Sequence, residues 1–173
     1  MERDFLFDLY RDSWNRRGQL ASEVALPLAV LPLLWGSLIL LVRSAPWDGD
    51  AITLPVFFIA VLAAAVVTFS KAVWYLLRSY YGYEYATIPM AADLLAYRAS
   101  IESTYSALTD GELLARQVFD QVLVNVLAEA TDVNARSNEA RTARLHSMRR
   151  SIAQTTILTA LAMIPWLLMQ ITY

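Results

Sequence analysis

The chain has 173 residues, of which 57% are hydrophobic and 17% are charged. Soluble domains carry about 25% charged residues, so this composition favours a membrane protein and argues strongly against a disordered chain. Fourteen Lys and Arg residues against 16 Asp and Glu residues leave no basic excess for binding nucleic acid. The chain has no cysteine and one histidine, His146. We therefore expect no enzyme activity, no catalytic or metal site and no cofactor.

Residues 1–23 precede the first uncharged window and carry five acidic residues beside four arginines. Signal-peptide leading segments are short and basic, so we expect this segment to be retained. Its apolar side chains fall on one broad helical face over residues 2–22, which predicts a cytoplasmic amphipathic helix. These side chains are Phe5, Leu6, Leu9, Tyr10 and Trp14.

Three windows lack any charged residue: Val24–Val42 and Ile52–Ser70 with 19 residues each, and Ser151–Tyr173 with 23. A 19-residue helix is ~28 Å long, close to the thickness of a hydrocarbon core. We predict transmembrane helices at 24–42, 53–76 and 152–171. Pro27 and Pro32 lie within the first, where each should free a carbonyl that needs a partner. The predicted fold is all-α: a helical hairpin over 24–77, a cytoplasmic helical region over 78–150 and a third span over 151–173.

The region between the second and third spans begins with a tyrosine-rich turn over residues 80–89. Pro89 fits the first position of a helix that should run to about Leu108, and Asp110 is a candidate N-cap for the next helix. From Glu112 to Ile164 there is no glycine and no proline. A continuous stalk that enters the membrane, or an antiparallel helical hairpin with residues 90–108, would both fit this pattern.

One face of the predicted stalk carries Asn134, Asn138, Arg141 and Leu145. Buried asparagines can fix register and oligomeric state between helices, so Asn134, Asn138 and Arg141 are candidates for a coupling interface with another subunit or a sensor. A solvated face on a polar helix explains the same pattern and is the more common case.

The third span contains four polar residues that could line a wetted path, Gln154, Thr155, Thr159 and Gln170. Arg149 and Arg150 would stand at its cytoplasmic mouth or among lipid headgroups. Hydrogen bonding between helices is a more common role for such residues. None of the three spans has a charge in its core, which argues against a secondary transporter.

Basic residues near the span ends predict the orientation in the membrane. They flank the N-terminal segment and the 78–150 region, whereas the loop over residues 43–52 holds only Arg43 beside Asp48 and Asp50. We therefore place the N-terminus and residues 78–150 in the cytoplasm and Tyr173 on the periplasmic side. The basic residues are Arg16, Arg17, Lys71, Arg78, Arg141, Arg144, Arg149 and Arg150.

Three stretches taken together resemble a known group of proteins. They are Tyr10–Trp14 with Arg16-Arg17-x-Gln19-Leu20 and Pro27, the junction Tyr81–Pro89, and Ala130-Thr131-Asp132-x-Asn134-x₃-Asn138-x₂-Arg141-x₃-Leu145. They resemble small multi-pass inner-membrane effectors of bacterial anti-phage systems, such as retron, cyclic-nucleotide and short Argonaute systems. The resemblance implies a protein that permeabilises or depolarises the inner membrane when a cytoplasmic sensor protein detects infection, and it carries over no catalytic residue. Because three helices bury little of their own surface, we also expect a homo-oligomer or a tight complex with another membrane subunit. The alternative is a non-conducting structural or regulatory subunit of a larger membrane complex.

The predicted orientation can be tested with alkaline phosphatase fusions, because this enzyme is active only outside the cytoplasm. A fusion after Tyr173 should be active and a fusion near Ser106 inactive, measured as phosphatase activity in intact cells. The reverse pattern would contradict the orientation inferred from the basic residues.

Overall fold

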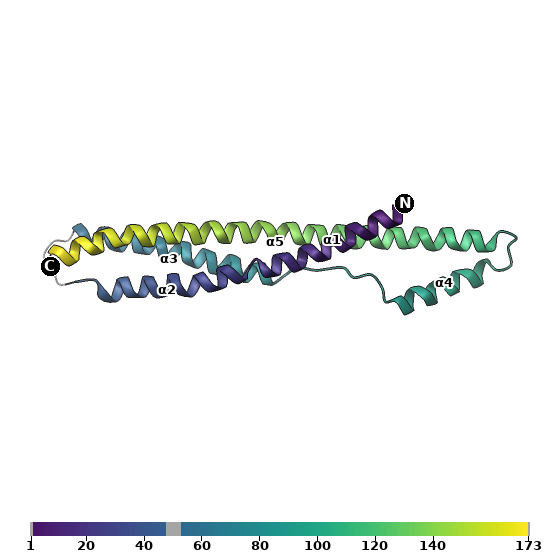
Figure 1. Cartoon of the computed structure of the whole chain (residues 1–173), viewed down its shortest axis with the longest axis horizontal. Coiled ribbons are helices and arrows are strands. Elements are labelled where there is room, and N and C mark those ends of the chain that lie inside the picture. Colours follow the sequence, from purple (N-terminus) through teal and green to yellow (C-terminus); the bar gives the residue numbers. More distant parts are fainter. Residues whose placement is uncertain (1, 48–52, 173) are drawn as a thin grey trace. The chain divides into compact units, whose positions relative to one another are not determined.

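The computed structural model describes residues 2–47 and 53–172, which form five α-helices (Figure 1). The helices are α1 (Glu2–Ser22), α2 (Ala25–Ser44), α3 (Thr53–Tyr80), α4 (Ala91–Tyr105) and α5 (Gly111–Thr172). The described part contains no strand, which confirms the all-α prediction. Asp48, Asp50 and Tyr173, which the orientation argument used, lie outside the described residues.

Three of these helices, α2, α3 and α5, contain a stretch long and apolar enough to cross a membrane. The first two begin within one residue of the predicted positions, and α3 continues four residues beyond the predicted end, to Tyr80. The third predicted span is not a separate helix, because it is the last part of the 62-residue α5. The continuous stalk open from the sequence is therefore observed, and it does not exclude the hairpin with residues 90–108, because α4 and the first part of α5 line one groove.

The chain divides into two compact units. The first, which we call the clasp unit, consists of Met1–Gln19 and Tyr83–Ala140. The second, the span unit, consists of Leu20–Gly82 and Arg141–Tyr173. The boundary therefore falls within the uninterrupted helix α5 and within α1.

The span unit is held together by buried side chains that recur at helical spacings, three or four residues apart on α2. On α3, Phe58, Ala65, Ala72 and Ser79 recur every seven residues, and the small side chains among them allow neighbouring helices to approach closely. One apolar cluster joins α2, α3 and α5 through Leu31, Ala72, Leu76, Leu145 and Met148, together with Leu20 and Val24. A second cluster nearer the other end comprises Leu41, Ala45, Phe58, Ala162 and Met169.

The two prolines predicted to free carbonyls in the first span have different effects. Pro27 lies in the first turn of α2, where a backbone N–H has no partner within the helix anyway. Only Pro32 stands inside α2 and removes an internal hydrogen bond, so the prediction holds for Pro32 and is wrong for Pro27. A further proline, Pro165, lies inside the last part of α5 and is fully buried.

A tight connection joins α4 to α5 in the clasp unit. The backbone N–H of Leu108 donates to the Tyr105 carbonyl, and that of Gly111 donates to the Leu108 carbonyl, both at 3.0 Å. The Asp110 carbonyl accepts the first hydrogen bond of α5, from Leu114 at 3.1 Å, which places Asp110 at the predicted N-cap position. Pro89 does not begin a helix, because α4 starts two residues later, after Met90.

Glycine is required at position 111 because there is no room for a side chain there, and not because of the backbone angles of this residue. A Cβ atom placed on Gly111 would lie 2.0 Å from the carbonyl oxygen of Tyr105, far inside van der Waals contact. Because that neighbour is backbone and cannot rotate away, relief of the clash requires α4 and α5 to move apart.

We predict that Gly111→Ala destabilises the clasp unit by about 1–3 kcal/mol, the usual cost of forcing extra atoms into a packed site. Thermal unfolding of the purified full-length protein would measure this cost. Gly18→Ala is the matched control, since nothing lies within 4 Å of a Cβ at that helical position. The control should stabilise α1 by up to about 1 kcal/mol. Equal melting temperatures for Gly111→Ala and the wild type would contradict the close approach.

Candidate functional site

Asn134 on α5 binds both backbone groups of one residue in the extended segment that follows α3. Its Oδ1 accepts from the backbone N–H of Ala86 at 2.9 Å, and its Nδ2 donates to the Ala86 carbonyl at 3.2 Å. The same Nδ2 lies 3.4 Å from the Ser13 hydroxyl of α1. The Asn134 side chain is fully buried. An amide side chain thus takes the place that a neighbouring β-strand would take.

Asn138 and Ser137 extend this contact by one helical turn. Asn138 Nδ2 donates to the Ser13 carbonyl at 2.8 Å, and its Oδ1 accepts from the Tyr85 hydroxyl at 3.0 Å. The Ser137 hydroxyl donates to the carbonyl of Glu84. Three side chains of α5 therefore hold residues 84–86, and two of them also hold α1.

Aromatic side chains cover the other side of the extended segment. The rings of Trp14 and Tyr85 lie 6.1 Å apart, and the Arg17 guanidinium stands 4.7 Å from the first and 4.5 Å from the second. Tyr10 accepts a hydrogen bond from the backbone N–H of Ile88 at 3.3 Å. Cation–π contacts of this kind contribute about 0.5–1 kcal/mol at exposed sites.

We call this arrangement the polar clasp: Asn134, Ser137 and Asn138 of α5, with Tyr10, Ser13, Trp14 and Arg17 of α1, around residues 84–88. An extended segment without a β-strand partner must satisfy its backbone N–H and C=O groups in another way. The clasp provides that partner from side chains. The polar clasp therefore binds a peptide segment mainly through the backbone groups of that segment. It can hold or release the segment without forming or breaking a covalent bond.

The polar clasp corrects one interpretation of the sequence. Asn134, Asn138 and Arg141 are only 0%, 6% and 8% exposed, so the solvated face that the sequence favoured is wrong. The Nε atom of Arg141, in the span unit, is buried without a hydrogen-bond partner among the described residues. Coupling to another subunit or a sensor stays a prediction for these three residues. In this structure, the side chains of Asn134 and Asn138 form hydrogen bonds with other residues of the same chain.

The four polar residues predicted to line a path fall on different faces of α5. Thr155 and Thr159 are buried inside the span unit, where the Thr155 hydroxyl lies 2.9 Å from Thr68 of α3 and that of Thr159 donates to the Thr155 carbonyl. Gln154 and Gln170 are exposed. Gln170 donates to the Ser44 carbonyl at the end of α2, at 2.8 Å, whereas Gln154 has no hydrogen bond within the described residues.

The two arginines predicted at the mouth are both exposed in the span unit. Arg149 forms an ion pair of 2.9 Å with Glu23, and nearby Arg144 donates to the Arg78 carbonyl at 2.8 Å. Arg78 in turn stands over the Trp74 ring. This end of the span unit is therefore basic and carries an aromatic side chain, a composition typical of a membrane interface.

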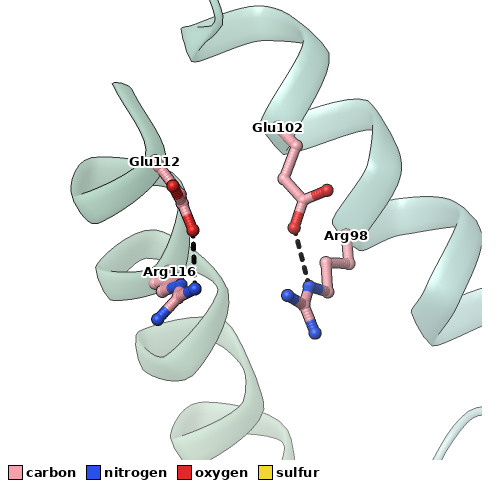
Figure 2. Close-up of polar contacts among 4 residues, drawn as sticks. All are labelled: Arg98, Glu102, Glu112 and Arg116. Atoms are coloured by element: carbon pink, nitrogen blue, oxygen red, sulfur yellow. Dashed lines mark hydrogen bonds and ion pairs between the residues drawn. The ribbon is translucent and has the colours of Figure 1, made fainter. Parts of the chain in front are cut away.

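A second polar cluster lies where α4 meets the start of α5 (Figure 2). Arg98 pairs with Glu102 on α4 at 2.8 Å, and Arg116 pairs with Glu112 on α5 at 2.6 Å, each within its own helix. Arg3 joins α1 to this region through Asp120, and a groove of about 290 Å³ lies among them. Exposed pairs of this kind contribute little, so we assign the cluster no function.

Several residues that make these contacts could not be identified from the sequence. Ser13 and Ala86 contribute mainly backbone groups, which every residue has. Tyr85 belongs to the tyrosine-rich stretch, but nothing in the spacing singles it out from its neighbours. Thr68 is an ordinary residue of the second uncharged window. The three-residue and four-residue spacing of Asn134, Ser137 and Asn138 was the one available indication.

Comparisons with known protein families, curated proteins and solved structures found no match to this chain. The functional proposal below therefore depends on the residues and geometry of the chain itself and on the resemblance noted in its sequence.

We predict that Asn134→Ala releases the extended segment, because the backbone groups of Ala86 lose their partner at a cost of about 1–3 kcal/mol. Amide exchange at residues 84–88 should then accelerate by roughly tenfold or more, since each 1.4 kcal/mol corresponds to a factor of ten. Hydrogen–deuterium exchange followed by mass spectrometry measures this directly.

The matched control is Asn125→Ala on the same helix. Asn125 is exposed and accepts only from Gln121, one turn away. Its replacement should leave exchange at residues 84–88 within twofold of the wild type. Unchanged exchange in Asn134→Ala would show that the asparagine does not hold the segment.

Proposed function

We propose that this chain is a bacterial inner-membrane effector that assembles with further copies of itself and permeabilises the membrane when a cytoplasmic partner triggers it. The observation that carries the proposal is how little of the apolar surface the chain covers by itself. In the most apolar windows of the three candidate spans, only 33%, 17% and 28% is buried. The remaining surface needs lipid or other copies of the chain.

The position of Gln154 supports permeation rather than anchoring alone. It lies near the start of the third span, on a face of α5 that the span unit leaves exposed. An amide in a hydrocarbon environment needs a hydrogen-bonding partner, which a second copy or a column of water would supply. In an assembly whose α5 helices turn this face toward a common axis, Gln154 lines the path and Arg149 and Arg150 stand at its cytoplasmic mouth.

The polar clasp supports a trigger. Asn134 and Asn138 lie on α5, which continues without interruption as the third span. A partner that displaces residues 84–88 would change the surroundings of this helix while leaving its backbone hydrogen bonds intact. A shift or rotation of one helix past its neighbours is an established way of passing such a change along a protein.

A specific observation favours the second candidate, a non-conducting subunit of a larger complex. The Thr155 hydroxyl contacts Thr68, and Gln170 bonds the end of α2, so both act between helices of the same chain. Polar residues used in this way stabilise packing and leave no path for ions. The two candidates therefore differ in whether Gln154 has a role.

We predict that Gln154→Leu abolishes depolarisation of cells that express the triggered protein, because it removes an exposed amide of the third span that has no hydrogen bond within the described residues. A potential-sensitive dye measures the effect, and membrane fractionation confirms equal insertion. Thr155→Val should weaken packing of the span unit while some depolarisation persists. Gln121→Leu, an exposed glutamine of the clasp unit, serves as the control and should match the wild type.

Two outcomes would contradict the proposal in different ways. Wild-type depolarisation by Gln154→Leu would remove this residue from any path. A wild-type protein that inserts but never depolarises cells, even with its neighbouring gene products present, would favour the non-conducting subunit.

A further inference from the structure

The outer face of the span unit carries a groove of about 300 Å³ between α2 and α3. Its walls are apolar: Trp35, Leu38, Ile39, Val42, Leu62 and Val66. The single charged residue that lines it is Arg43, in the last turn of α2. The groove is apolar along its length and cationic at one end. An anionic lipid is complementary to it, because the acyl chain is apolar and the headgroup carries a negative charge.

The groove has the length of one acyl chain. Helix α2 has 20 residues and is about 30 Å long, which equals the thickness of a hydrocarbon core. Trp35 is near the middle of α2, and Arg43 is eight residues further along, or about 12 Å. One leaflet contributes about half of the core, roughly 15 Å. With α2 spanning the hydrocarbon core, the groove would reach from the headgroup level toward the bilayer midplane.

Trp35, which lines the groove, stacks on an aromatic side chain of α3. Trp35 of α2 stacks on Phe69 of α3 with ring centroids 5.3 Å apart and an interplanar angle of 24°. Tryptophan in membrane proteins is enriched at the interfaces, where its N–H meets water and headgroups. At mid-helix, the Trp35 ring instead forms an apolar wall against which a terminal methyl group can pack.

Arg43 provides the polar end. It is exposed and is the only Lys or Arg between residues 18 and 70. No ion pair of Arg43 lies within the described residues. A guanidinium presents several N–H donors in a planar fork that fits the oxygens of a phosphate, and its charge favours an anionic headgroup.

We propose that this groove binds one phospholipid with an anionic headgroup, its acyl chain along α2 and α3 and its phosphate on Arg43. The proposal depends on the membrane insertion of the span unit, which belongs to the proposed function. A second copy of the chain fits the groove less well. Copies inserted in one membrane share an orientation, so packing α2 against α2 would bring two Arg43 side chains to the same depth, where like charges repel.

The test uses the full-length protein, stripped of lipid in detergent and then incubated with dioleoyl phosphatidylglycerol or dioleoyl phosphatidylcholine. Native mass spectrometry counts the lipid molecules retained. The wild type should retain one phosphatidylglycerol in preference to phosphatidylcholine. Arg43→Gln should lower phosphatidylglycerol retention roughly fivefold, because one arginine near a membrane surface contributes about that factor. Leu62→Trp should fill the groove and reduce retention of both lipids.

Matched variants separate the site from general effects of charge and size. Arg136→Gln removes an exposed cation of the clasp unit, and Leu33→Trp enlarges an exposed residue of α2 that does not line the groove. Both should retain lipid as the wild type does. If Arg43→Gln and Leu62→Trp retain as much phosphatidylglycerol as these controls, the lipid site is overturned.

Two further readouts keep the alternatives apart. The chain has no native cysteine, so Leu62→Cys introduces a single thiol. Efficient disulfide crosslinking between Leu62→Cys copies in membranes would show that a second copy fills the groove, which also overturns the lipid site. Alkaline carbonate extraction tests insertion separately. Release of the protein as soluble material contradicts the proposed function itself, whereas an inserted protein without lipid preference contradicts only this inference.

Discussion

The need to satisfy the backbone of one extended segment determines how the clasp unit is built. Residues 84–88 follow α3 without helix or strand structure. Side chains bond this backbone instead: Asn134 at Ala86, Ser137 at Glu84 and Tyr10 at Ile88. Asn134 and Asn138 also contact Ser13, and Asn138 accepts from the Tyr85 hydroxyl, so α1 is held by groups that also hold the segment. Loss of Asn134 would leave donors and acceptors from two elements without partners at once. A polar pair on one helix therefore organises three parts of the chain.

The buried face of α5 changes character along its length. Within the clasp unit it begins with Ala115, Leu127 and Ala130 and becomes polar at Asn134 and Asn138, whereas within the span unit it ends with the apolar Ala162 and Met169. Thr155 and Thr159 lie between these extremes and direct their hydroxyls to carbonyls one turn earlier or to Thr68. Such hydroxyls satisfy themselves locally and can pack in a membrane at little cost. Gln154 is exposed and has no such bond within the described residues, and this difference supports a role for Gln154 in permeation.

The sequence predicts the spans well because exclusion of charge is a local property of composition. Continuity of α5 was one of two open alternatives, and the lack of glycine and proline between Glu112 and Ile164 proved the better indication. The environment of Asn134 and Asn138 could not be derived, because they bond the backbone of Ala86 and of Ser13, respectively, and a backbone partner leaves no trace in the sequence. The sequence also did not show which polar residues of the third span are buried and which are exposed. Gln154 and Thr155 are adjacent, yet one residue turns a helix by about 100°, which is enough to separate an exposed face from a buried one.

The central claim is that copies of this chain together open a path through a membrane. Reconstitution of the purified full-length protein into sealed vesicles, with release of an entrapped small dye as the readout, tests it most directly. The account predicts release that rises more steeply than linearly with the ratio of protein to lipid, since several copies must meet to form the path. Vesicles that contain inserted protein and stay sealed at every ratio, with the polar clasp intact and also with it opened by Asn134→Ala, would contradict it.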